Sequence, residues 1–146
     1  VVQMAGNHDH SLSMILVQML ALAFKDRKDV EIVVNFQPRQ YVEWGKTLVG
    51  ITHGDGIKDS ELPLLMAQEQ AEAWGRSLNR VWFTGHLHRE MQFEYNGVQV
   101  IHLPSLSGTD LWHAEQGYVG ARKALSTYIL SKEEGIVASI PVQPDR

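Results

Sequence analysis

Apolar and polar positions along the chain predict a series of short strands and two long helices. Between residues 11 and 27 apolar side chains recur every three or four positions, which is the spacing of an amphipathic helix, and Ser11 is the predicted N-cap. A second helical pattern covers residues 61–78. Runs rich in β-branched and aromatic residues predict strands at residues 1–5, 31–35, 40–44, 47–52, 81–84, 91–95, 98–103, 125–130 and 136–140.

Turn chemistry between these strands indicates how they connect. Asn96-Gly97 is a dipeptide typical of two-residue hairpins, and further hairpins are predicted across Gly45-Lys46 and residues 132–135. Strands that alternate with helices and end in hairpins predict an α/β fold, layered around a mixed sheet. With 146 residues and 44% hydrophobic content, we assign residues 1–146 to a single domain. The predicted core includes Met14, Met19, Phe24, Met66 and Trp74.

Three polar loops follow predicted strands and concentrate histidine. They are Gly-Asn-His-Asp at residues 6–9, His-Gly-Asp-Gly at 53–56 and Gly-His-Leu-His at 85–88. Loops at the carboxyl ends of strands gather at one edge of an α/β sheet, where ligands bind. The sequence therefore predicts that these three loops form one site.

The residue types in these loops suit a metal. The chain has no cysteine, so a metal would be held by His, Asn, Asp or Glu. Neutral imidazole is the commonest protein metal ligand, and an amide oxygen adds a hard donor beside it. A loop just beyond a strand can aim the rings of His86 and His88 at two adjacent ions.

Composition limits the class of partner and the compartment. The formal charge is -4, the isoelectric point is about 5.9, and the 13 Lys and Arg are scattered, so no basic stripe for a phosphate backbone is visible. The longest apolar stretch, residues 14–24, is too short to span a bilayer, and no signal peptide is recognisable. We therefore expect a cytoplasmic protein without a membrane partner.

The ordered motifs resemble those of the calcineurin-like metallophosphoesterases. That family carries Asp-x-His, Gly-Asp, Gly-Asn-His-Asp/Glu, His-Gly and Gly-His-x-His in this order, and residues 6–9, 53–54 and 85–88 match the last three. The segment 101–105 also resembles the strand and loop that follow the final motif. The resemblance implies an αββα sandwich with mixed sheets. Because the two leading motifs have no counterpart, we expect the chain to be the C-terminal part of that fold, truncated at its N-terminus.

The resemblance also implies a role for each matched residue. Asn7, His53 and His86 would bind one metal and His88 the other, while His8 would stabilise the phosphate or protonate the leaving oxygen and Asp9 would orient His8. The implied cofactors are two divalent ions, Mn²⁺ in preference to Fe or Zn²⁺. The implied reaction is hydrolysis of a phosphomonoester or phosphodiester by a hydroxide that two metals activate. The missing motifs would remove ligands of the first metal, so this chain alone is expected to be incomplete as an enzyme.

Alternatives remain open at several of these positions. Asp9 could cap the first helix, and Asp55 could be a turn former instead of a residue that supports the metal ligands. Histidines at 10, 102 and 113 are predicted to be structural or surface residues. Residues 104–113, rich in hydroxyls and ending in Trp112-His113, are either a substrate-contacting loop or an ordinary capped turn.

The function also has alternatives. A binding or scaffold module would keep the family-like fold and some ligands without turnover. A Ser-His-Asp hydrolase using Ser105 or Ser107 is disfavoured, because the glycines of a nucleophile elbow are absent around them. The substrate stays open between nucleotides, nucleic acid, phosphoproteins and small phosphodiesters, and the oligomeric state is not predicted.

Overall fold

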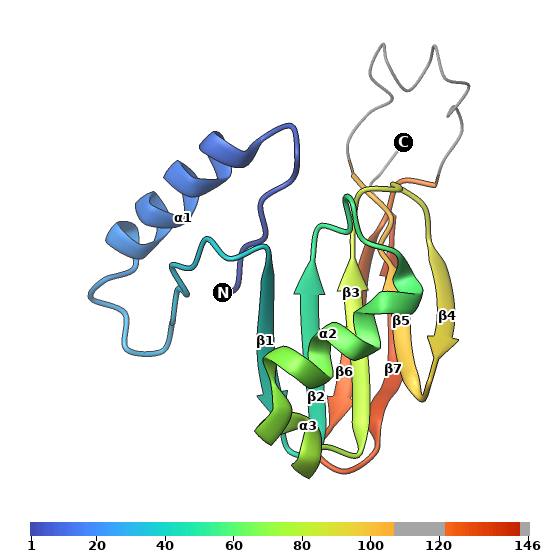
Figure 1. The fold of residues 1–146 in the computed structure, drawn as a ribbon. Coiled ribbons are helices and arrows are strands. Elements are labelled where there is room, and N and C mark those ends of the chain that lie inside the picture. The colour runs from blue at the N-terminus through green and yellow to red at the C-terminus, as the bar shows by residue number, and fades with distance from the viewer. Residues whose placement is uncertain (107–121, 144–146) are drawn as a thin grey trace.

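A five-stranded mixed sheet forms the centre of the protein in the computed structural model, which describes residues 1–106 and 122–143. The strands are β1 (Arg39–Trp44), β2 (Thr47–Thr52), β3 (Asn79–Thr84), β4 (Met91–Tyr95) and β5 (Val98–His102). Their order is β1-β2-β3-β5-β4, in which β2, β3 and β5 run parallel and the two outer strands pair antiparallel (Figure 1). This topology brings the carboxyl ends of β2, β3 and β5 to one edge.

Helices cover one face of this sheet. A 3-10 turn, η1 (Asp59–Glu61), leads into α2 (Leu62–Glu69) and α3 (Ala71–Arg76), which lie across the strands (Figure 1). Leu62 and Met66 on α2 pack against Leu48, Trp82 and Val100 of the sheet. The Trp82 indole donates a hydrogen bond to the Leu62 carbonyl at 3.1 Å, so its one polar group is satisfied inside this core.

A hairpin covers the other face. Strands β6 (Leu125–Ser131) and β7 (Gly135–Val142) form a separate two-stranded sheet. Tyr128, Leu130 and Ile136 of this hairpin pack on a second cluster of sheet residues, formed by Val49, Val81 and Ile101. Helices, central sheet and hairpin form successive layers, which confirms the predicted layered α/β fold with a mixed sheet. The assignment of all 146 residues to one domain stays a prediction.

Two predicted strands are wrong. Residues 1–5 and 31–35 meet through a single parallel bridge between Val2 and Val33, with the Val33 amide donating to the Val1 carbonyl at 2.9 Å. Neither segment joins the ladder of the central sheet. Apolar β-branched residues favour a strand only where a neighbouring strand supplies hydrogen-bond partners, so the local pattern predicted too much here.

Both predicted helices differ in their bounds. Helix α1 (His10–Ala23) begins one residue before Ser11, so that Asp9 is the N-cap, and it ends four residues before residue 27. The second pattern divides at Gln70, whose φ of -129° and ψ of 46° lie outside the helical region. Pro63 at the start of α2 fits the first helical turn, where no backbone donor is lost.

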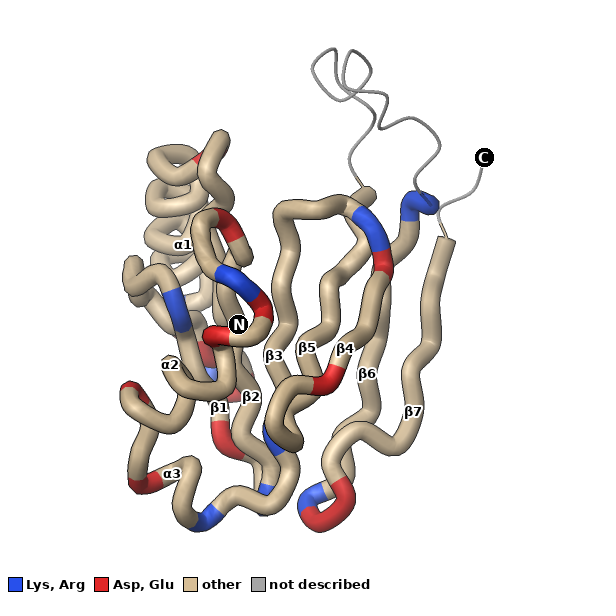
Figure 2. Tube along the Cα trace, turned by 45° about the vertical axis from the view of Figure 1, so that its right-hand side comes forward, with Lys and Arg blue, Asp and Glu red and all other residues tan. Residues whose placement is uncertain are grey.

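Of the five side chains predicted to be core, Met14 and Trp74 are half-buried and two others are exposed. Met19 is 63% exposed and Phe24 36% exposed, whereas Met66 is fully buried as predicted. Helix α1 lies beside the sheet instead of over a face, and it contains no Lys, Arg, Asp or Glu (Figures 1 and 2). Only Ser13 and Val17 of α1 are buried, because periodicity gives an apolar face without specifying what it packs against.

In residues 1–106 and 122–143, none of the helices has the length and apolar character needed to cross a membrane.

Candidate functional site

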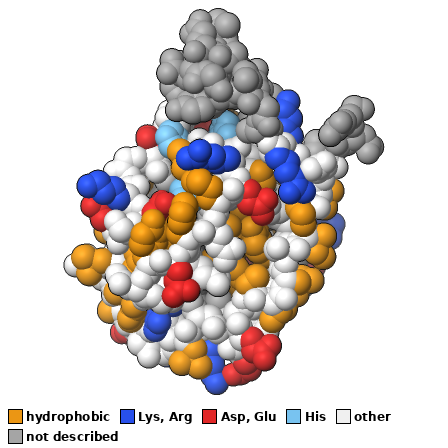
Figure 3. Space-filling view, turned by 90° about the vertical axis from the view of Figure 1, so that its right-hand side faces the viewer, with side chains coloured by type: hydrophobic (Ala, Val, Ile, Leu, Met, Phe, Trp, Pro, Cys, Tyr) orange, Lys and Arg blue, Asp and Glu red, His pale blue; other side chains and the backbone are white. Residues whose placement is uncertain are grey.

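The parallel strand ends set the frame of the candidate site. Thr52 of β2 is in register with Thr84 of β3, and Thr84 is in register with His102 of β5. The loops that follow β2 and β3 carry the two later histidine motifs, and Gly85 donates its amide to the His53 carbonyl at 3.0 Å. Histidine side chains gather at this end of the molecule in Figure 3. The predicted convergence of these two loops is therefore seen in the structure.

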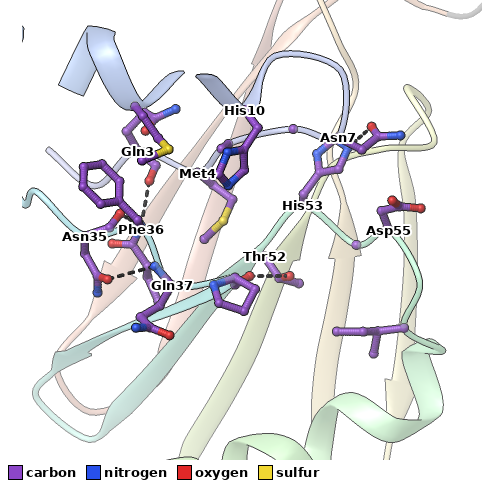
Figure 4. Close-up of a pocket in the computed structure, with 17 residues that line it drawn as sticks. Gln3, Met4, Asn7, His10, Asn35, Phe36, Gln37, Thr52, His53 and Asp55 are labelled. Atoms are coloured by element: carbon purple, nitrogen blue, oxygen red, sulfur yellow. Dashed lines mark hydrogen bonds between the residues drawn. The ribbon is translucent and has the colours of Figure 1, made fainter. Parts of the chain in front are cut away.

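The loop before α1 reaches the same place. Asn7 Oδ1 lies 3.0 Å from His53 Nε2, although the two residues are 46 positions apart in the sequence (Figure 4). The Gly6 amide donates to Asp9 Oδ1 at 2.7 Å, which folds this loop back on itself. A Cβ atom on Gly6 would lie 2.9 Å from Asp9 Oδ1 and 3.3 Å from His53 Cε1, so glycine permits the close approach.

His86 joins this pair from the third loop. Its ring lies edge-on to the His53 ring with 5.2 Å between centroids. His86 Nε2 is 3.7 Å from Asp55 Oδ1, which places the Asp55 carboxylate beside the second histidine. The structure thus brings Asn7, His53 and His86 together, with Asp55 at their margin.

The loop that holds His86 and His88 has an unusual backbone. His86 has a φ of 62° and His88 a φ of 51°, both in the left-handed region that favours glycine. Each such residue costs about 1–3 kcal/mol and persists only where the surroundings enforce it, a situation that is concentrated at functional sites. Gly54 lies against this turn, and its φ of 95° is a conformation that glycine adopts without strain.

Neighbouring charges act on His53 from all three loops. Burial lowers the pKa of His53 below its usual value, and the cationic forms of His86 and His88 lower this pKa further. The carboxylates of Asp55 and Asp9 oppose this shift. The ring of His53 is therefore neutral near pH 7, which is the form that binds a metal.

Three of the predicted metal ligands, Asn7, His53 and His86, lie together, and any divalent ion they held would need further ligands. The Asn7 Oδ1 to His53 Nε2 distance of 3.0 Å is that of an ordinary hydrogen bond, in which the ring nitrogen donates to the amide oxygen. However, among the residues that the structure describes, no three His, Asp or Glu side chains are grouped closely enough to hold a metal ion. An amide oxygen with two imidazoles suits Mn²⁺, Fe or Zn²⁺, and His88 is the one predicted ligand left for a second ion.

His8 and Asp9 are exposed at the tip of the first loop. The recorded hydrogen bond of the Asp9 side chain comes from the Gly6 amide, and Asp9 makes no side-chain cap bond to α1. The Asp9 side chain therefore shapes the loop, while its carbonyl accepts from the Ser13 amide at the start of α1. The role of His8 at a phosphate, and that of Asp9 in orienting His8, stay predictions.

A cavity of about 280 Å³ adjoins Asn7 and His53. It lies between the first loop and the ends of β1 and β2, and Met4, Phe36 and Pro38 contribute apolar lining while Asn35 and Gln37 contribute amides (Figure 4). Such a mixed lining beside a polar cluster is typical of small-molecule sites.

A buried polar network behind the loops was missed by the sequence reasoning. His102 Nδ1 lies 2.8 Å from Thr84 Oγ1, and His102 Nε2 lies 2.8 Å from Asp59 Oδ2. The prediction that His102 is structural agrees with its burial, but its partners were not predicted. Thr84 and His102 end neighbouring strands, so strand pairing was the signal that could have found them.

The hypothesis of a substrate-contacting loop at residues 104–113 concerns residues mostly outside the described part, because the structure describes the chain only to residue 106 before resuming at 122. Trp112 and His113 lie in that interval, and so does Ser107.

Comparisons with known proteins give the following. No protein-family model matches the chain, and no curated protein matches it in sequence. Among solved structures, the chain is similar to a conserved uncharacterized protein of Streptococcus pneumoniae TIGR4 described as a predicted phosphoesterase. The TM-score is 0.43 with 12% sequence identity, over 98% of this chain and 95% of that chain. A likeness of this size does not identify the family of the chain.

Proposed function

We propose that this chain is a metal-dependent phosphoesterase domain that hydrolyses a phosphomonoester or a phosphodiester. The observation that supports this most directly is the 3.0 Å approach of Asn7 Oδ1 to His53 Nε2, with His86 beside them, from three separate loops. This convergence offers an amide oxygen and two imidazoles to a common ligand at an exposed edge, which is the arrangement a candidate active site requires. The left-handed backbone at His86 gives independent support, since strain of this kind concentrates at functional sites.

In this proposal each residue has a distinct task. Asn7, His53 and His86 would hold one ion, and His88 would contribute to a second. A bound divalent ion would supply positive charge to phosphate oxygens and lower the pKa of water. His8, which is exposed next to Asn7, would hydrogen-bond the phosphoryl group or give a proton to the leaving oxygen.

Hydrolysis assays test the proposal directly. The complete protein that contains this chain would be incubated with p-nitrophenyl phosphate and bis-p-nitrophenyl phosphate in Mn²⁺, Zn²⁺ or EDTA. Asn7→Ala, His53→Ala and His8→Ala should each lower the rate on the order of a hundredfold or more, as for other deleted groups that stabilise transition-state charge. Gln92→Ala, an exposed amide on β4, is the matched control for Asn7 and should keep the wild-type rate. A hydrolysis rate that is undiminished in EDTA would contradict the proposal.

A second candidate is a non-catalytic binding or scaffold module. It is favoured by the finding that the described residues contain no group of three His, Asp or Glu positioned for a metal. Metal analysis of the purified chain separates the two candidates. Two bound ions support catalysis, whereas one ion or none, together with no hydrolysis, supports the scaffold.

A further inference from the structure

We propose that His102 is a positioning residue of the candidate metal site, which ties the loop after β2 to the ends of β3 and β5 and so keeps His53 and His86 close together. This inference rests on the proposed function, because it concerns the same site. His102 itself lies behind the candidate ligands and would not touch a metal or a phosphate.

The contacts of His102 are short, and the one to Thr84 is buried whereas Asp59 is half-buried. Its ring bridges Thr84 Oγ1 and Asp59 Oδ2, each at 2.8 Å from one ring nitrogen. His102 is 4% exposed and Thr84 is 1% exposed. Thr84 and His102 are register partners on adjacent parallel strands, so both side chains point to the sheet face that η1 and α2 cover.

The proton arrangement makes this bridge directional. In a neutral ring whose Nε2–H donates to the Asp59 carboxylate, Nδ1 carries no hydrogen and accepts from the Thr84 hydroxyl. In this neutral form both ring nitrogens have a hydrogen-bond partner, Asp59 at Nε2 and Thr84 at Nδ1. Loss of either partner would leave a buried ring nitrogen without a hydrogen bond, which is costly inside a protein.

Each end of the bridge leads to a candidate ligand. Asp59 closes the loop that begins at His53, and that loop contains Gly54 and Gly56, both with positive φ. Glycines in such conformations give a loop little stiffness of its own, so its position depends on anchors. The bond from His102 to Asp59 anchors the far end of this loop.

The other end of the bridge leads to His86. Thr84 precedes His86 by two residues, and its carbonyl accepts a hydrogen bond from the Leu103 amide at 2.7 Å. The next amide, that of Gly85, donates to the His53 carbonyl at 3.0 Å. Thr84 is thus held at its side chain and its carbonyl, and Gly85 at its amide, and this rigid base can enforce the left-handed φ of 62° at His86.

A buried histidine with two hydrogen bonds can also stabilise the fold without affecting a metal site. The test therefore measures metal affinity and the spectrum of the bound ion, which a change in stability alone does not alter. The hydroxyl of Thr84 offers a matched pair. Thr84→Val keeps the shape but removes the donor, whereas Thr84→Ser keeps the donor and loses a methyl group. Asp59→Ala removes the other partner, and Asp59→Asn keeps an acceptor for Nε2–H without the charge.

The experiment is a Co²⁺ titration of the full chain followed by visible absorption, with thermal unfolding of each metal-free variant measured in parallel. Thr84→Val and Asp59→Ala should weaken Co²⁺ binding about 10-fold to 100-fold, the usual effect of removing groups that orient metal ligands, and should change the spectrum of the bound ion. Thr84→Ser and Asp59→Asn should restore most of the affinity. Ile101→Val, on the same strand but facing the β6–β7 hairpin, controls for lost stability and should leave the affinity within about threefold.

Two failures can be told apart. If the wild-type chain binds no Co²⁺, the proposed metal site is wrong and this inference is overturned with it. If the wild type binds Co²⁺ while Thr84→Val and Asp59→Ala match Ile101→Val in affinity and spectrum, the metal site stands and the positioning role of His102 is overturned.

Discussion

At the scale of single residues, the left-handed backbone of His86 is the feature most specific to the candidate site. A side chain in this region meets its own backbone closely, at a cost of about 1–3 kcal/mol. Such a conformation persists only where contacts with the surroundings offset its free-energy cost. The contacts of His86 are with the Asp55 carboxylate and the His53 ring. We therefore expect the histidine side chain at this position to lower the stability of the fold.

The variant His86→Gly tests whether the His86 side chain lowers folding stability while it supports metal binding. Glycine relieves the strain at φ 62°, although its greater freedom in the unfolded chain offsets part of the gain. We expect the free energy of unfolding without metal to stay level or rise by up to about 1 kcal/mol, while metal binding is lost. Urea unfolding and a Co²⁺ titration measure the two effects. Asn96→Gly, at a φ of 51° in the hairpin turn, is the control and should leave metal binding unchanged.

At the scale of secondary-structure elements, the sheet and the helix layer are joined by polar contacts at their margin as well as by the core. Arg39 on β1 binds the Glu69 carboxylate at the end of α2 through two nitrogens, at 2.8 and 2.5 Å. The Tyr41 hydroxyl donates to the same carboxylate at 2.7 Å. Glu69 therefore connects one helix to one strand through two partners.

This connection predicts a pH dependence of stability. The hydrogen bond from Arg39 holds the pKa of Glu69 below its usual value, and Tyr41 adds to this effect. Because the pKa in the folded state is lower than in the unfolded state, the stabilisation is complete above the unfolded pKa and is lost as the pH falls through the folded value. Glu69→Gln should cost about 1 kcal/mol at pH 7 and much less at pH 3.

Urea unfolding at the two pH values measures this difference. Glu94→Gln, an exposed carboxylate on β4, is the control and should change stability by less than about 0.5 kcal/mol at either pH. An equal loss for Glu69→Gln at pH 7 and pH 3 would show that the contact is not electrostatic.

At the scale of the whole molecule, the candidate ligands come from parts of the chain that pack little against each other. Asn7 precedes α1, which lies beside the sheet, whereas His53 and His86 end two of its central strands (Figure 1). A metal held by all of them would join the first segment to the sheet. An ion that binds the folded state and not the unfolded state would then raise the free energy of unfolding of the whole chain.

Metal removal tests this coupling. At a free Mn²⁺ concentration about 100 times the dissociation constant, the free energy of unfolding should rise by about 2.7 kcal/mol, and EDTA should abolish the gain. Asn7→Ala should reduce the increment at the same Mn²⁺ concentration, while Gln92→Ala should keep it. Thermal unfolding at several Mn²⁺ concentrations gives the measurement. A transition that does not move with Mn²⁺ would argue against the proposed ligand set.

Local chemistry allowed much of this fold to be predicted. The β1–β2 hairpin across Gly45-Lys46 and the β4–β5 hairpin across Asn96-Gly97 form where turn residues and flanking strands indicate them. Both depend on contacts between residues close in sequence, which a pattern records directly. The mixed sheet and the gathering of the histidine loops at one edge follow from the same patterns.

The sequence by itself determined which residue types stand at the strand ends, and hence that an amide and several imidazoles are available to a metal. Only the tertiary structure decided that Asp59, Thr84 and His102 form one network, since their contacts join strands and a loop up to 43 residues apart. The tertiary structure also decided that the apolar face of α1 stays largely exposed and that residues 1–5 add no strand to the sheet. The physical reason is the same in each case: a local pattern states what a segment can bury or bond, whereas the partner is supplied by a part of the chain far away in sequence.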